Sequence, residues 1–93
     1  MARKDVWQQL RALRRRAHNL KPRDIERVAE EAGWLYHHTT GGHAIYRKEG
    51  FPPNLSIKLH HLGGKLALRL LDLIESSLYE EEERQSNGDK EAG

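Results

Sequence analysis

Apolar side chains recur at helical spacing near the start of the chain. They are Val6, Trp7, Leu10, Leu13 and Ala17. Arginines fill most of the remaining circumference, so the pattern predicts an amphipathic helix with a strongly basic polar face within residues 1–21.

A second helical pattern follows directly. Its apolar stripe consists of Ile25, Val28, Ala29 and Ala32. Pro22 suits the first turn of this helix, because the N–H that proline lacks would have no helical partner there. Gly33 is expected to end the helix as its C-terminal cap.

Between residues 34 and 60 the pattern becomes extended. The segments WLYHHT, HAIYRK and LSIKLH are typical of strands, and in the last one Leu55 and Ile57 alternate with polar residues. Gly41 and Gly42 predict a tight hairpin turn, because glycine adopts positive φ without steric cost. The segment EGFPPN predicts a longer loop, since its prolines cannot donate hydrogen bonds to a strand ladder.

The most apolar helical pattern covers residues 64–79. Its central stripe is Ala67, Leu70, Leu71, Ile74 and Leu78, widened by Leu66 and Leu73. We expect this segment to be the core helix. Residues 80–93 are rich in acid and offer no apolar side chain able to anchor them, so they predict a disordered tail.

The order of these elements predicts an α+β fold in two layers. Three short antiparallel strands are not stable alone in water, so helices should cover one face of the sheet and leave the other open for a ligand. We therefore expect a basic N-terminal helix at residues 1–21, a folded domain at residues 22–79 and an acidic tail at residues 80–93.

Composition narrows the classes of function. The chain has 93 residues and no cysteine, which excludes a disulfide framework, a thiolate zinc site and a thiol nucleophile. Neither a secretory signal pattern nor an apolar run of membrane-spanning length occurs, so we expect a soluble cytoplasmic protein. The formal net charge is only +2, but basic residues crowd the first quarter, which favours a polyanionic partner or, more simply, solubility.

Several short segments together resemble a known family. They are AEEAGW at a helix end, GGHAIYR at a hairpin turn, KLHHLGGK at the end of the third strand and a closing amphipathic helix. Over about residues 23–79 the chain resembles the HicA (YcfA-like) toxins, small mRNA interferases with a fold like that of double-stranded-RNA-binding domains. The resemblance implies that His43 acts in RNA cleavage, and that a HicB-like antitoxin is a partner. Gly42 stands where family members usually have serine.

Cleavage of this kind requires neither metal nor cofactor, because RNA carries its own nucleophile. A single histidine can activate the 2′-hydroxyl near neutral pH, and neighbouring cations can stabilise charge on the phosphate. Candidate RNA contacts are Arg14, Arg15, Arg16, Arg47, Lys48, Lys58, His60, His61 and Lys65. Strand alternation puts His43 on the same side as Ile45 and Arg47, although a buried position for Ile45 would conflict with an exposed His43.

Other interpretations remain open. The histidine pairs His37-His38 and His60-His61 suggest zinc, but adjacent strand residues should point to opposite faces, so we expect no metal site. The same fold could serve as a non-catalytic module that binds RNA or protein. The arginine-rich helix could alternatively lead a DNA-binding accessory protein.

Overall fold

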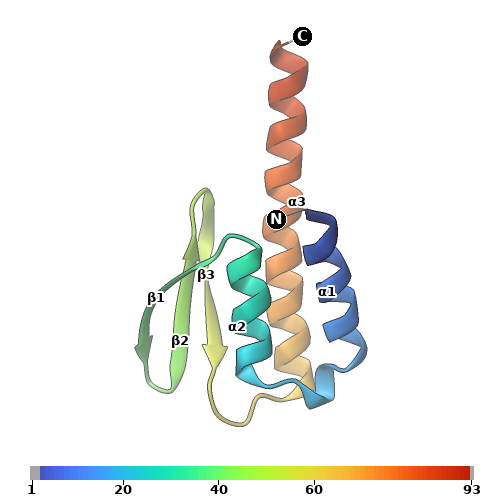
Figure 1. The fold of residues 1–93 in the computed structure, drawn as a ribbon. Helices are drawn as coiled ribbons and strands as arrows, with labels where there is room; N and C mark the ends of the chain where they lie inside the picture. Colours follow the sequence, from blue (N-terminus) through green and yellow to red (C-terminus); the bar gives the residue numbers. More distant parts are fainter. Residues whose placement is uncertain (1–2, 93) are drawn as a thin grey trace.

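The computed structural model describes residues 3–92, and the side chains of residues 4–85. Its elements are α1 (Arg3–Arg15), the 3₁₀ helix η1 (Ala17–Asn19), α2 (Pro22–Glu31), β1 (Leu35–Thr40), β2 (His43–Lys48), β3 (Phe51–Lys58) and α3 (Gly64–Ala92). The strands form an antiparallel sheet in the order β1-β2-β3, and α1, α2 and α3 lie together on one side of it (Figure 1). The predicted α+β class is confirmed. Residues 1–2 of the predicted N-terminal segment and residue 93 of the predicted tail lie outside the described residues.

The core lies between the sheet and the helices. Ala44 and Tyr46 of β2 and Leu55 and Ile57 of β3 are buried, as strand alternation predicts for the face that meets the helices. The apolar stripes predicted for α2 and for the first half of α3 are buried against them, and Trp34 is fully buried. By contrast, every residue of β1 is exposed, so β1 is an edge strand that the helices leave uncovered.

Helix α1 is docked on the domain. Val6, Leu10 and Leu13 are buried in the common core. On its flank, the Arg14 guanidinium donates to Asp72 (Nη2 to Oδ1, 2.6 Å) and reaches Glu75 (Nη2 to Oε1, 2.9 Å) on α3. Apolar burial therefore fixes the helix, and the partly exposed ion pairs add a smaller contribution.

Glycines set the geometry of two connections. Gly41 and Gly42 form the turn between β1 and β2 with φ values of 55° and 77°, the left-handed region in which a Cβ is strained. Gly33 follows α2 with φ of 98°, and the Trp34 N–H donates to the Ala29 carbonyl at 2.9 Å. This bond closes the helix end and places Trp34 in the core.

The predicted EGFPPN loop is wrong in part. Strand β3 begins at Phe51 and includes both Pro52 and Pro53, so only a short turn with Gly50 at φ of 79° joins it to β2. The register shifts here, because three residues of β3 lie between the partners of Tyr46 and Lys48. Both prolines lie in this bulge, where the residues of β3 have no ladder partners in β2, and the other side of β3 has no neighbouring strand, so their missing donors are tolerated.

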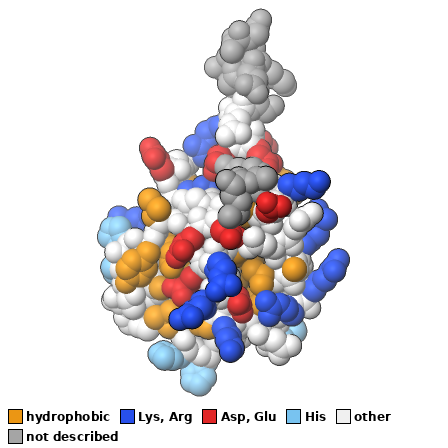
Figure 2. Space-filling model, viewed as in Figure 1, with side chains coloured by type: hydrophobic (Ala, Val, Ile, Leu, Met, Phe, Trp, Pro, Cys, Tyr) orange, Lys and Arg blue, Asp and Glu red, His pale blue; other side chains and the backbone are white. Residues whose placement is uncertain are grey.

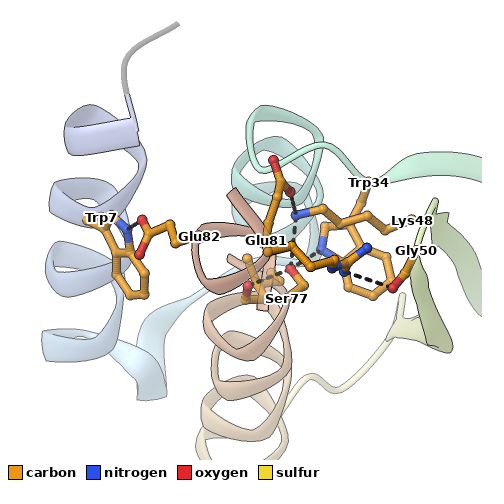
Figure 3. A network of polar contacts seen from close by, with 9 residues as sticks. Trp7, Trp34, Lys48, Gly50, Ser77, Glu81 and Glu82 are labelled. Atoms are coloured by element: carbon orange, nitrogen blue, oxygen red, sulfur yellow. Dashed lines mark hydrogen bonds and ion pairs between the residues drawn. The ribbon is translucent and has the colours of Figure 1, made fainter. Parts of the chain in front are cut away.

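The predicted disordered tail also differs from the structure, in which α3 continues to Ala92. Polar contacts along residues 77–84 hold the helix against the sheet and α1, as Figure 3 shows. The Lys48 ammonium, whose side chain is only 7% exposed, pairs with Glu81 at 2.8 Å and donates to Ser77 at 3.2 Å. Ser77 also accepts from the Trp34 indole at 3.2 Å. Apolar pattern alone could not reveal this anchoring.

Candidate nucleic-acid interface

The face of the sheet that points away from the helices is open. Strand β2 is regular from His43 to Tyr46, so His43, Ile45 and Arg47 share this face while Ala44 and Tyr46 point to the core. Ile45 is only half-buried and does not belong to the core, which removes the conflict between a core position for Ile45 and an accessible His43.

The ring of His43 is held at the start of β2. Its Nδ1 lies 3.0 Å from the Gly41 carbonyl oxygen, which can only accept, so Nδ1 carries the proton in this bond. In the neutral ring this tautomer leaves a lone pair on Nε2. Across the sheet, His43 is the direct partner of Lys58, and the Leu59 N–H donates to the Gly42 carbonyl at 2.9 Å. The turn is thereby tied to the end of β3.

Three connections meet at the end of the molecule that carries His43. They are residues 16–21, the β1–β2 turn and residues 59–63, seen at the bottom of Figure 1. The ring of His18 packs against Gly64, so the connection after α1 also touches the start of α3. This end of the molecule, which we call the basal end, therefore gathers loops from distant parts of the chain.

The basal end is basic. Its exposed bases are Arg15, Arg16, Lys21, Arg23, His60, His61 and Lys65. The segments 15–23, 40–48 and 58–66 contain no acidic residue. Figure 2 shows histidines along the lower and left edges of the molecule and lysines and arginines over its lower front. Such a surface attracts polyanions.

Two candidate RNA contacts are directed elsewhere. Lys48 points to the helix side of the sheet, where it pairs with Glu81. Arg14 pairs with Asp72 and Glu75, which raise the pKa of its guanidinium through hydrogen bonds. Both residues stabilise the docking of helices, and neither belongs to the open face or the basal end.

Strand β1 contains a bulge that regular strand alternation does not predict. The register shifts between Tyr36 and His38, and this bulge brings the rings of His37 and His38 together with their Nδ1 atoms 2.7 Å apart. The expectation that these two rings point to opposite faces is therefore wrong. The nearby Arg47 charge lowers the pKa of His37, with desolvation and His38 acting in the same direction. Within residues 4–85, no group of three or more histidine or acidic side chains is placed to hold a metal ion.

A shallow cleft of about 540 Å³ lies next to Arg47. Its lining consists of Arg47, Lys48, Gly50, Phe51, Pro52 and Asn54. The cleft therefore lies where β2 meets β3 beside the β2–β3 turn, with Arg47 as its contribution from the open face.

No described helix is both long and apolar enough to cross a membrane. Comparison with protein-family models, with curated proteins and with solved structures finds no match to this chain.

Proposed function

We propose that the protein is a metal-independent endoribonuclease of the HicA type, with a core like that of double-stranded-RNA-binding domains, which cleaves mRNA in the cytoplasm. The observation that carries the proposal is the setting of His43. The ring lies on the open face, is oriented by the Gly41 carbonyl and has Lys58 as its cross-strand partner. A histidine in a fixed orientation beside a cation is the smallest set of groups that can promote attack of an RNA 2′-hydroxyl on the adjacent phosphate.

The residues define a sequence of proton and bond changes. Nε2 of His43 accepts the proton of the 2′-hydroxyl, and the oxygen then bonds to the adjacent phosphorus. The bond from phosphorus to the 5′-oxygen breaks, and that oxygen takes a proton from water. The hydroxide left behind accepts the proton held on His43, which restores the neutral ring. Lys58, on the same face as His43, stabilises the charge that builds on the phosphate oxygens. The products are a 2′,3′-cyclic phosphate and a free 5′-hydroxyl.

The basal end supplies binding that is independent of sequence. Arg15 and Arg16 at the end of α1 lie at the same end of the molecule as His60, His61 and Lys65. Contacts of this kind to phosphates give affinity that falls steeply with salt. A HicB-like antitoxin, implied by the sequence resemblance, would inhibit the enzyme by covering His43 and this cationic surface.

The test is cleavage of RNA in EDTA by the parent protein, by His43→Ala and by Glu49→Ala as an exposed control in the β2–β3 turn, away from the basal end. We expect products with cyclic phosphate ends from the parent and from the control, and none from His43→Ala. RNA in which each 2′-hydroxyl is methylated should bind but stay intact. Equal cutting by parent and His43→Ala, or cutting that EDTA abolishes, would contradict the mechanism.

The alternative is a non-catalytic module that binds RNA on the same surface. The specific observation that favours it is the turn itself, in which Gly42 offers no hydroxyl next to His43. If the parent retains RNA with strong salt dependence but produces no cleavage, this second function replaces the first.

A further inference from the structure

The bulge in β1 creates a cluster that the proposed cleavage step does not use. We propose that His37, His38 and Arg47 form a second phosphate subsite, which binds a phosphodiester of the strand whose cleavage His43 promotes. The inference rests on the proposed function, because it assumes a nucleic-acid strand on the open face. The subsite consists of the bulge in edge strand β1 and of Arg47, which lies diagonally across from that bulge on β2.

The register places the three side chains on one face. His38 is paired with Ile45, and Leu35 is paired with Arg47, so these positions belong to the face that points away from the helices. His37 is the extra residue of the bulge, and its ring contacts that of His38 with centroids 4.9 Å apart. Both rings are exposed, as is Arg47. Residues 34–48 include no carboxylate that could compete for these donors.

The chemistry of the cluster fits a phosphate better than a metal ion. The guanidinium of Arg47 can donate two parallel hydrogen bonds to phosphate oxygens. Because the two Nδ1 atoms share one hydrogen bond, one neutral imidazole can add its Nε2–H as a donor, and the other can do so once it is protonated. A metal ion at the paired Nδ1 atoms would instead be repelled by the charge of Arg47. The same charge keeps His37 neutral to lower pH than usual.

Phosphate binding should therefore be coupled to proton uptake. The charged or titratable groups that act on His37 are Arg47 on β2 and His38 on β1. A bound phosphodiester offsets the charge of Arg47, which removes the main cause of the lowered pKa and favours protonation of the ring. Affinity at this subsite must rise as pH falls through the range in which histidine titrates.

The distance between His43 and Arg47 along β2 sets the length of nucleic acid that can contact both residues. Arg47 lies four residues beyond His43 on the same strand and face, which corresponds to about 13 Å at about 3.3 Å per residue. A dinucleotide bound at His43 is too short to reach Arg47, whereas a strand of about six nucleotides covers both positions, at about 3.4 Å per stacked nucleotide.

The experiment measures binding of oligodeoxyribonucleotides of two and six nucleotides, which lack the 2′-hydroxyl and cannot be cut. We compare the parent with Arg47→Gln, with a His37→Asn/His38→Asn double variant and with Lys58→Gln, after checking their folding by circular dichroism. Arg47→Gln should weaken hexamer binding about tenfold and leave dinucleotide binding unchanged. It should also reduce the slope of log K against log salt by about 0.7. Lys58→Gln should weaken both ligands.

The pH dependence of binding tests the contribution of His37 and His38 separately from that of Arg47. Hexamer affinity of the parent should increase between pH 7.5 and 5.5 by a larger factor than that of the double variant. The subsite is refuted if Arg47→Gln weakens both ligands equally or neither, or if the double variant keeps the full pH response. Failure of the proposed nuclease has a different signature, since lack of RNA cleavage leaves this length-dependent effect in place.

Discussion

The ion pair between Lys48 and Glu81 should hold the second half of α3 on the domain. The Lys48 side chain is 7% exposed and that of Glu81 is 30% exposed, with Nζ and Oε2 2.8 Å apart. A hydrogen bond between charged groups contributes about 1.5–3 kcal/mol, and the exposure of Glu81 places this one at the lower end. Glu81→Gln should therefore lower the free energy of unfolding by about 1.5 kcal/mol. In a domain of this size that corresponds to a fall in Tm of about 6–12 °C.

The assay is a double-mutant cycle on urea unfolding with Lys48→Met, Glu81→Gln and the double variant. Glu83→Gln is the matched control, because Glu83 is exposed on the same stretch of α3. We expect a coupling energy of about 1.5 kcal/mol that persists in high salt, since the ammonium is shielded from solvent. A coupling below about 0.3 kcal/mol would refute the role of this pair, as would equal effects of the Glu81 and Glu83 substitutions.

Two further predictions concern docking and turn geometry. Leu10→Ala should cost about 2–5 kcal/mol, because Leu10 is fully buried at the contact of α1 with the core, whereas Arg15→Ala should change the unfolding free energy by less than about 0.5 kcal/mol. Gly42→Ala should destabilise the fold by about 1–2 kcal/mol through its positive φ although no atom lies near the added methyl, and Gly63→Ala, also in open space but without positive φ, should cost less. Thermal and urea unfolding measure both effects, and equal costs within either pair would contradict the stated reason.

Much of the domain could be predicted from the sequence because the local signals agree. In α2, Pro22 begins the helix, the apolar stripe faces the core and Gly33 follows the end with positive φ. The bounds of β2 match the segment HAIYRK, and its alternation correctly separates His43 from Ala44. Residues whose role follows from strand or helix period are therefore assigned correctly from the sequence.

The remaining features depend on departures from that period or on tertiary contacts. A bulge in β1 turns His37 and His38 to one side, and no local residue pattern predicts that bulge. The charge of Lys48 suggests a solvent-facing base, but Glu81 on α3, distant in sequence, decides where its ammonium lies. Residues 80–85 continue the helix because α1 and the β2–β3 turn provide hydrogen-bond partners for their side chains. A prediction from hydrophobic pattern alone does not account for such tertiary contacts.

Docking of α1 changes what its arginines can contribute to binding. A mobile basic arm would lose conformational freedom on each encounter with RNA, and that entropy would oppose binding. Burial of Leu10 and Leu13 means that the fold has already fixed Arg15 and Arg16 at the basal end before any ligand arrives. Folding therefore already orders these arginines, so loss of the apolar stripe should weaken both stability and the proposed RNA binding. Loss of the two arginines alone should weaken only binding.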